Sequence, residues 1–261
     1  MKIDRIRDGV RAAVEDEIAV EAPLEIRVGG KALTVVMRTP GHDEELARGF
    51  LYAENLVDDG ADIVSITRPD KLTGDELGNV VDVTLRPGAR TPAGERLFYA
   101  SSSCGVCGKN AISALRVRAP VVSSTLTVAS ATLSALPDRL RAAQPLFART
   151  GGVHASGLFD AGGTLEAARE DVGRHNALDK LIGWALALNR IPLHDRLLVV
   201  SGRVSYEIVQ KAIAAGIPLI AAVGAPSTLA IDLAEQFAVT LIGFLRNGGM
   251  NVYTHGERVT E

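Results

Sequence analysis

The sequence has 261 residues, of which 47% are hydrophobic and 23% charged, a balance typical of a soluble protein with a substantial core. Its net charge of −3 and aromatic content of 4% argue against nucleic acid or an anionic membrane as a general partner. No apolar run has the length of a signal peptide or membrane span, and two cysteines form no disulfide framework. We therefore expect a cytoplasmic protein with reduced thiols.

The first hundred residues predict a small α+β unit. Residues 25–37, EIRVGGKALTVVM, have the alternation of two strands around a Gly-Gly turn. Residues 40–57 predict a helix with Asp43 as its N-cap, and its apolar face consists of Leu46, Phe50 and Leu51. Residues 61–68 and 79–86 alternate as two further strands.

From about residue 150 the sequence alternates regularly between strands and helices, which indicates a layered α/β sheet. The expected strands cover 150–160, 163–171, 196–201, 217–224 and 239–244. The expected helices cover 134–147 (ending before Pro145 or kinking near it), 172–188, 204–216 and 226–238. The apolar stripe of the longest helix is formed by Leu178, Leu181, Ile182, Ala185 and Leu188. Asn247-Gly248 in the last stretch is a strong hairpin signal.

The only two cysteines, Cys104 and Cys107, form a C-x-x-C pair in the glycine-rich stretch SSSCGVCGKN. Three interpretations of this pair stay open at this point. A zinc site needs four ligands, and only histidines at unfamiliar spacings are present to complete it: His154, His175 and His255. A thioredoxin-like redox pair is the second interpretation, and two inert thiols are the third.

The residues around the cysteines favour reactive thiols. Gly105 and Gly108 give the backbone freedom to carry a thiol between two partners. Lys109 and a helix expected just after it would stabilise the thiolate, which is the nucleophilic form. These features suit transfer of a sulfur atom as a persulfide.

A second cluster of polar residues lies in REDVGRHNALDK, residues 169–180. If this stretch is helical, Asp171, His175 and Asp179 share one face, with Arg174 beside them. The alternative is a solvated helix face with ordinary ion pairs. The polar side chains gather at the N-terminal end, which favours a site there.

Two strand ends have the character of anion pockets. Ser201-Gly202-Arg203 follows a buried strand and precedes a helix, where free N–H groups and an arginine attract phosphates. Residues 222–228, AVGAPST, repeat the arrangement without the arginine. Simple helix capping by Ser205 or Ser227 is the alternative for both. The P-loop motif is missing from the sequence, which excludes P-loop nucleotide triphosphatases.

Six blocks together identify a family resemblance: SCGVCGK, TGGVHASGLF, EDVGRHNALDKLIG, SGRVSYEIVQKA, GAPSTLAIDLAE and GFLRNGGMNVYTH. From about residue 20 onward, the chain resembles the formate dehydrogenase accessory proteins, FdhD-type sulfurtransferases. The resemblance implies a three-layer α/β core like that of cytidine deaminases, with a smaller N-terminal α+β domain. We place the domains at 1–118, ending in the C-x-x-C segment, and at 119–261, and we expect a homodimer.

The resemblance also implies the activity. Such a protein accepts sulfane sulfur from a cysteine desulfurase as a cysteine persulfide. It then delivers the sulfur to bis-molybdopterin guanine dinucleotide, with molybdenum or tungsten, for the formate dehydrogenase catalytic subunit. We expect no catalytic zinc, because the helices that begin EDVGRHN and SGRVSYE lack the ligand motifs of zinc deaminases.

Mapped onto this chain, Cys104 is the expected persulfide carrier, with Cys107 assisting. The segment that matches the family's cofactor-holding stretch is Phe244, Leu245, Arg246, Asn247, Gly248 and Gly249. GDP would mimic the guanine end of the cofactor. Our candidates for phosphate contacts are Arg203, Arg174 and Lys109, and those for the pocket near the metal are His154, His175 and Asp171. A cofactor chaperone that moves no sulfur and a disulfide oxidoreductase remain alternatives.

Overall fold

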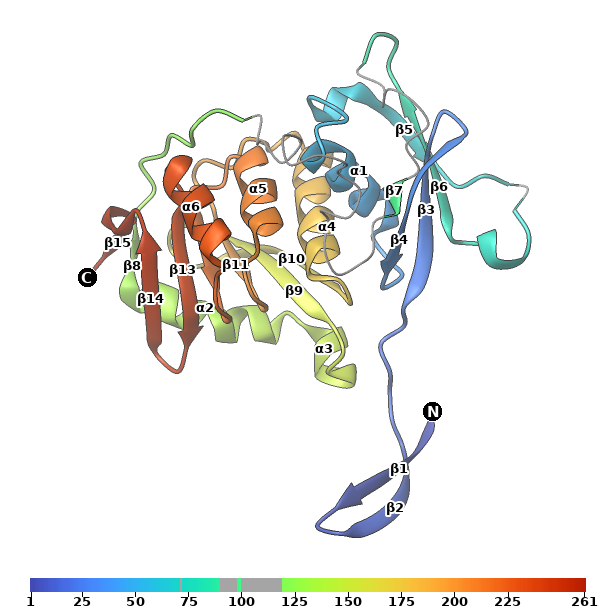
Figure 1. Cartoon of the computed structure of the whole chain (residues 1–261), viewed down its shortest axis with the longest axis horizontal. Helices are drawn as coiled ribbons and strands as arrows, with labels where there is room; N and C mark the ends of the chain where they lie inside the picture. Colours follow the sequence, from blue (N-terminus) through green and yellow to red (C-terminus); the bar gives the residue numbers. More distant parts are fainter. Residues whose placement is uncertain (71, 90–97, 100–118) are drawn as a thin grey trace.

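The computed structural model describes residues 1–70, 72–89, 98–99 and 119–261, which form two α/β units and an N-terminal hairpin (Figure 1). The hairpin consists of β1 (Lys2–Arg7) and β2 (Val10–Glu15) and projects away from the rest of the chain. Cys104, Cys107 and Lys109 lie outside the described residues, so what the sequence predicts for them stays a prediction. Within the described ranges, no helix combines the length and apolar character that a membrane crossing requires.

The N-terminal unit is a five-stranded sheet, in the order β5-β6-β3-β4-β7, that packs against helix α1. Its elements are β3 (Ala22–Val28), β4 (Lys31–Arg38), α1 (Asp43–Ala53), the 3-10 helix η1 (Gly60–Asp62), β5 (Ile63–Thr67), the 3-10 helix η2 (Gly74–Glu76), β6 (Val80–Leu85) and β7 (Phe98–Tyr99). The expected hairpin is confirmed, because β3 and β4 run antiparallel around Gly29 and Gly30. These two residues have φ angles of +57° and +78°, which glycine adopts without strain. The strands expected at 61–68 and 79–86 are β5 and β6.

Helix α1 begins at Asp43, so the prediction that Asp43 is the N-cap is wrong by one position. The N-cap is His42, with a φ angle of 57°. Asp43 is buried, and its carboxylate accepts a hydrogen bond from Arg38 Nε at 2.8 Å and pairs with Arg68 Nη2 at 2.6 Å. Burial alone would raise the pKa of Asp43, but the two guanidinium groups hold it below its usual value. The predicted apolar face packs in the core as expected: Leu46, Phe50 and Leu51.

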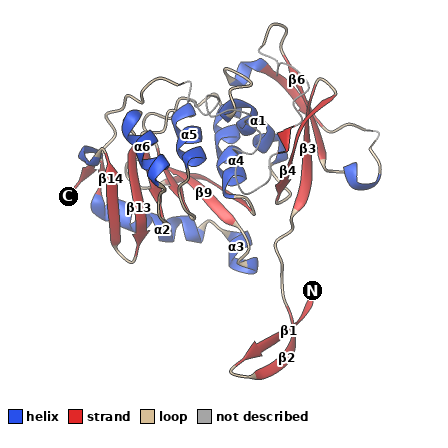
Figure 2. Cartoon of the chain, in the orientation of Figure 1, coloured by secondary structure: helices blue, strands red, loops and turns tan. Residues whose placement is uncertain are grey.

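The C-terminal unit is a six-stranded sheet with helices on both faces (Figure 2). The strand order is β10-β9-β11-β12-β13-β14, and β11, β12 and β13 are parallel. Its strands are β9 (His154–Phe159), β10 (Leu165–Asp171), β11 (Leu197–Val200), β12 (Leu219–Ala222), β13 (Thr240–Arg246) and β14 (Gly249–Thr254). Its helices are α2 (Ser130–Ala142), α3 (Pro145–Thr150), α4 (Arg174–Ala187), α5 (Tyr206–Ala214) and α6 (Thr228–Gln236).

Helix α2 covers one face of this sheet, and α4, α5 and α6 cover the other, so the unit is layered (Figure 1). Outside the sheet, the short strands β8 (Val128–Ala129) and β15 (Val259–Thr260) pair with each other, and η4 (Gly256–Arg258) precedes β15. The expected alternation of strands and helices is confirmed in order and type. The specific likeness to cytidine deaminases, and the domain boundary between residues 118 and 119, stay predictions.

Three details differ from the expectations. Helix α2 begins at Ser130, four residues before its predicted start, although it ends before Pro145 as expected, at Ala142. Asp171 is the last residue of β10 and not part of a helix, because α4 begins only at Arg174. Leu188 caps the end of α4 and is 53% exposed, so it does not belong to the apolar stripe.

The two units are joined where α1 crosses α4 at very short distance. A β-carbon at Gly49 would lie 1.8 Å from the backbone oxygen of Asp179, and one at Gly183 would lie 1.8 Å from that of Glu45. Each glycine therefore admits the backbone of the other helix, and the contact is reciprocal. No residue with a side chain fits at either position without separating the helices.

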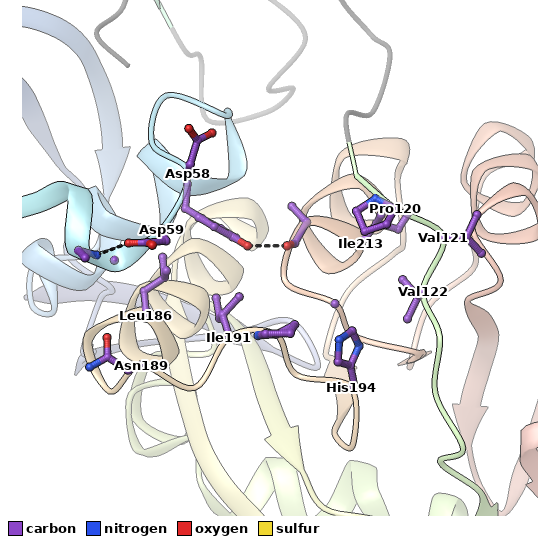
Figure 3. A pocket seen from close by; sticks show the side chains of 16 residues that line it. Asp58, Asp59, Pro120, Val121, Val122, Leu186, Asn189, Ile191, His194 and Ile213 are labelled. Atoms are coloured by element: carbon purple, nitrogen blue, oxygen red, sulfur yellow. Dashed lines mark hydrogen bonds between the residues drawn. The ribbon is translucent and has the colours of Figure 1, made fainter. Parts of the chain in front are cut away.

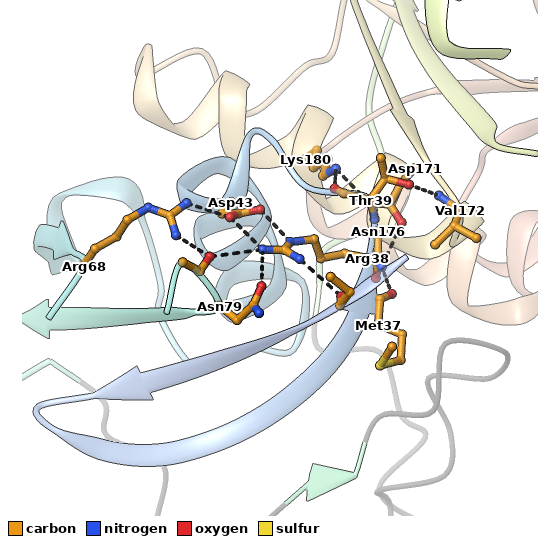
Figure 4. A network of polar contacts seen from close by, with 12 residues as sticks. Met37, Arg38, Thr39, Asp43, Arg68, Asn79, Asp171, Val172, Asn176 and Lys180 are labelled. Carbon is orange, nitrogen blue, oxygen red and sulfur yellow. Dashed lines mark hydrogen bonds and ion pairs between the residues drawn. The ribbon is translucent and has the colours of Figure 1, made fainter. Parts of the chain in front are cut away.

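Polar side chains surround this crossing and are buried with it (Figure 4). Asp171 is fully buried, and it pairs with Lys180 Nζ at 2.7 Å and accepts a hydrogen bond from Thr39 N at 3.1 Å. Lys180 also donates to the Thr39 carbonyl oxygen at 2.8 Å. Asn176 Nδ2 donates to the Met37 carbonyl oxygen at 2.7 Å. The end of β4 is thereby hydrogen-bonded to the β10–α4 connection.

We expect Gly183→Ala to destabilise the protein by about 3 kcal/mol, because its methyl group overlaps the backbone of α1. Urea unfolding followed by circular dichroism measures this change. Glu44→Ala, at an exposed position of α1, is the matched control and should change stability by less than about 0.5 kcal/mol. A Gly183→Ala variant as stable as this control would contradict the close crossing.

Candidate functional site

The candidate site lies along the edge of the six-stranded sheet where β11, β12 and β13 end. The loops that follow these strands are hydrogen-bonded to one another in sequence. Gly224 N donates to the Gly202 carbonyl oxygen at 3.1 Å, and Phe244 N donates to the Gly224 carbonyl oxygen at 3.0 Å. On the other side, Ser201 N donates to the Ala155 carbonyl oxygen at 3.0 Å. The edge is therefore one continuous surface from the start of β9 to the β13–β14 hairpin.

Glycines permit the loops to come this close. A β-carbon at Gly224 would lie 2.8 Å from the Gly202 carbonyl oxygen and 3.0 Å from Arg203 N. A β-carbon at Gly243 would lie 2.7 Å from Pro226 Cδ. Helices α5 and α6 begin beside these loops, so the N–H groups of their first turns lie at the same edge. This arrangement of backbone donors suits a phosphate-bearing ligand.

His154 and Arg174 flank Gly202 at one end of this edge. A β-carbon at Gly202 would lie 3.3 Å from His154 Nδ1 and 3.9 Å from Arg174 Cδ. Burial lowers the pKa of His154, and the positive charges of Arg174 and His175 lower it further. His154 is therefore neutral at neutral pH, and one of its ring nitrogens donates while the other accepts.

His175, in the first turn of α4, contacts two residues at the start of α5. Its Nε2 lies 3.1 Å from Ser205 Oγ and 3.2 Å from Glu207 Oε2, and Ser205 Oγ donates to Glu207 Oε2 at 3.0 Å. A hydrolytic Ser-His-acid triad needs the serine and the acid on opposite ring nitrogens. Here both lie on Nε2, so the group does not activate Ser205 as a nucleophile.

Burial alone would raise the pKa of Glu207. Hydrogen bonds from His175 and Ser205 and the charges of His175 and Arg174 outweigh it, and they lower this pKa to about 2. Glu207 is thus an anion throughout the physiological range. It holds the His175 ring in place by accepting a hydrogen bond at Nε2.

The predicted site residues do not all take the same role in the structure. Asp171 is fully buried, and besides Thr39 and Lys180 its carboxylate accepts hydrogen bonds from Gly173 N at 2.8 Å and Asn176 Nδ2 at 3.1 Å. Its contacts within the described chain are structural. The expectation that Asp171, His175 and Asp179 share a helix face is wrong, because Asp171 lies on a strand.

At the other end of the edge, residues 244–249 comprise the end of β13, the turn at Asn247-Gly248 and the first residue of β14. The hairpin predicted from Asn247-Gly248 is confirmed, with φ angles of 53° and 75°. Phe244 has a φ angle of 54°, which a bulky residue seldom adopts, and the guanidinium of Arg246 lies 5.5 Å from the centre of its ring. Leu245 is fully buried and packs in the hydrophobic core, so it does not face a ligand at this edge.

The structure thus brings most of the predicted residues to one edge: His154, Arg174, His175, Arg203 and the turn at 244–249. Arg203 is exposed, beside Gly224. Glu207 was not among the residues predicted from the sequence. Its place two residues after Ser205, where a helix was expected to begin, could have indicated that it belongs to the site. The capping alternative holds for Ser227, which accepts a hydrogen bond from Ala230 N at 3.3 Å at the start of α6. Ser205 instead contacts His175 and Glu207.

A cleft of about 480 Å³ lies at the opposite ends of α4 and α5, so it is separate from this edge (Figure 3). Tyr52 closes part of it by donating a hydrogen bond to the Ala214 carbonyl oxygen at 2.8 Å. Asp58 and Asp59 lie on one side of it. Carboxylates and helix C-termini make this cleft unfavourable for phosphates. Among the described residues, no three His, Cys, Asp or Glu side chains form a group that would hold a metal ion.

Comparisons with known proteins agree on one family. The model of the FdhD/NarQ family matches residues 19–260. A sulfur carrier protein FdhD from Mycobacterium tuberculosis is 50% identical over 254 residues, covering 94% of this chain and 92% of that protein. One from Sulfolobus acidocaldarius is 43% identical over 259 residues, covering 99% and 97%. The crystal structure of a protein described as a formate dehydrogenase accessory protein, from Desulfotalea psychrophila, matches with a TM-score of 0.81 and 26% identity, covering 100% and 98%.

The Glu207 carboxylate predicts a pH dependence of stability. Its pKa is about 2 in the folded protein against 4.5 for an unperturbed glutamate, so its contribution is complete above pH 4.5 and is lost as the pH falls towards 2. We expect Glu207→Gln to be less stable than the wild type by about 2 kcal/mol at pH 6. The difference should shrink as the pH falls from 4.5 to 2.5.

Urea unfolding at several pH values measures this difference. Glu44→Gln, at an exposed position, is the control and should show no such change. A difference between wild type and Glu207→Gln that stays constant across this range would show that the His175–Glu207 contact is not formed.

Proposed function

The chain belongs to the FdhD/NarQ family, and on this premise we propose that it is a sulfur carrier for the maturation of formate dehydrogenase. The chain matches relatives named sulfur carrier proteins over nearly its whole length, and this observation carries the proposal. The phosphate-suited edge of the C-terminal sheet supports it further. A carrier that serves a dinucleotide cofactor needs a place to hold phosphates while sulfur is delivered.

In the proposed reaction, the Cys104 thiolate attacks the outer sulfur of a persulfide on a cysteine desulfurase. A sulfur–sulfur bond forms at Cys104, the donor cysteine leaves as a thiolate, and no net oxidation occurs. Delivery passes this sulfur to the bis-molybdopterin guanine dinucleotide cofactor and restores the Cys104 thiolate, with the metal centre supplying two electrons. Cys107 assists as a second thiol. These steps make the protein a sulfurtransferase.

The same proposal gives each residue of the edge a role towards the cofactor cargo. Arg203 and Arg246 are exposed arginines near opposite ends of the loop series, suited to pair with pyrophosphate oxygens. The Phe244 ring beneath the Arg246 guanidinium suits contact with a planar base. Neutral His154 would offer a ring nitrogen near the metal end, beside the His175 ring that Glu207 holds in place. Lys109 is proposed as a further phosphate contact.

We expect wild-type protein incubated with a cysteine desulfurase and L-cysteine to gain the mass of one sulfur atom, which a reductant removes. Cys104→Ala should lose this gain, and Cys107→Ala should keep at least part of it. Intact-protein mass spectrometry measures both. The absence of any gain in the wild type would leave a cofactor chaperone as the better account. Reduction of insulin disulfides by the protein would favour an oxidoreductase.

GDP binding tests the edge separately from the thiols. We expect Arg246→Ala and Arg203→Ala each to weaken GDP binding by about tenfold or more, because a charge-assisted contact to phosphate is lost. Isothermal titration calorimetry measures the affinities. Lys31→Ala, which removes an exposed positive charge at the start of β4, is the control and should bind GDP as the wild type does. If the wild type and all three variants bound GDP with equal affinity, the assignment of this edge as the phosphate-binding site would be refuted.

A further inference from the structure

The N-terminal hairpin β1–β2 is a two-stranded sheet whose strands pair only with each other in the described chain. A two-stranded hairpin on its own is marginally stable in water. The first 20 residues also hold five of the eleven large hydrophobic side chains that are exposed among the described residues: Met1, Ile6, Val10, Ile18 and Val20. Of these, Ile6 and Val10 lie on the strands and Met1 lies next to β1, whereas Ile18 and Val20 follow β2. The hairpin therefore presents unpaired strand edges together with some uncovered apolar surface.

The hydrogen bonds within the hairpin determine which backbone groups point outward. Met1 N donates to the Asp16 carbonyl oxygen at 2.7 Å, and Asp16 N donates back to the Met1 carbonyl oxygen at 2.9 Å. Hydrogen-bonded pairs alternate along antiparallel strands. In this register the backbone N–H and C=O groups of the even-numbered residues of β2 are hydrogen-bonded to β1. The backbone groups that point outward, away from β1, belong to Arg11, Ala13 and Glu15.

We propose that the outer edge of β2 pairs with the same edge of a second copy of this chain, antiparallel about a two-fold axis at Ala13. In this register Ala13 lies opposite Ala13 of the second copy, and Arg11 lies opposite Glu15 of the second copy. Two-fold symmetry repeats the Arg11–Glu15 pair, so the edge is complementary in charge to itself. The result is a four-stranded sheet in the order β1-β2-β2-β1.

Other pairings of the hairpin with itself are less favourable. Sliding the register by two residues in one direction places Arg11 opposite Ala13 and removes the charge pairs. Sliding it in the other direction places Arg11 opposite Glu17, which lies beyond the end of β2 and already pairs with Arg149 at 3.3 Å. On the outer edge of β1, the outward groups belong to Lys2, Asp4 and Ile6. Centring two copies there puts the two Asp4 carboxylates directly opposite each other, which is repulsive.

The existing contacts of the hairpin extend this complementarity. Lys2 is the direct cross-strand partner of Glu15, and Arg11 pairs with Asp4 at 3.0 Å. A row across the four strands then reads Lys2, Glu15, and Arg11 of the second copy, so that charges of opposite sign are neighbours. On the other face, Val14 would lie opposite Ala12 of the second copy, which joins the apolar surfaces of the two hairpins.

The inference is independent of the proposed function, because the family model begins at residue 19 and the hairpin precedes it. It concerns how two copies associate, whatever they carry. Its test therefore uses association alone as the readout.

We expect the wild type to be a dimer in sedimentation equilibrium. Glu15→Arg should raise its dissociation constant by about tenfold or more, because two attractive pairs become repulsive. The quadruple variant Lys2→Glu/Asp4→Arg/Arg11→Glu/Glu15→Arg reverses the charges on both strands. It keeps the opposite-charge pairs within each hairpin and between the two copies, so it should return the constant to within about threefold of the wild type. Asp232→Arg, on the exposed face of α6, is the matched charge reversal and should leave it unchanged.

Cross-linking tests the register. In a Cys104→Ser/Cys107→Ser background, Ala13→Cys should form a disulfide-linked dimer on copper-catalysed air oxidation, because residues opposite each other are about 5.5 Å apart between α-carbons. Ala12→Cys lies off the axis on the opposite face and should remain monomeric on a non-reducing gel. A monomeric wild type, a dimer unaffected by Glu15→Arg, or equal cross-linking of both cysteine variants would overturn the proposal.

Discussion

The reciprocal crossing of α1 and α4 is the constraint on which the rest of the structure depends. Gly49 and Gly183 each admit the backbone of the opposite helix, at positions where a β-carbon would lie 1.8 Å from a carbonyl oxygen. This approach fixes the N-terminal sheet against the C-terminal one. It also brings the end of β4 to the start of α4, next to the edge that carries the candidate site.

So close a contact buries charged groups, and each of them has a partner. Asp171 pairs with Lys180, and Asp179, which precedes Lys180 in α4, pairs with Lys211 of α5 at 2.7 Å. Burial alone would lower the pKa of Lys211, but the charges of Asp179 and Glu54 raise it on balance. Removing one member of such a pair leaves an uncompensated buried charge, so these pairs specify how the helices meet.

The order of strands and helices was predictable because buried strands are continuous apolar runs and the helices between them repeat with the helical period. The burial of the polar face of α4 was not predictable. It depends on α1, which lies about 130 residues earlier in the chain, and local spacing carries no information on that contact. The spacing of Asp171, His175 and Asp179 fits a helix, but Gly173 occupies the N-cap and ends the strand before it. The first hairpin was missed although Asp8-Gly9 is a turn signal, because alternating charges obscured its strands.

The direction of α4 and α5 separates two kinds of surface in one unit. Both helices begin at the edge with His154, Arg174 and Arg203, where their N–H groups and these cations attract anions. Both end at the cleft beside Asp58 and Asp59, where carbonyl groups and carboxylates repel anions. A helix as long as α4 places these ends roughly 20 Å apart. A phosphate-bearing ligand is therefore directed to one end of the sheet by the orientation of the helices themselves, before any individual arginine contributes.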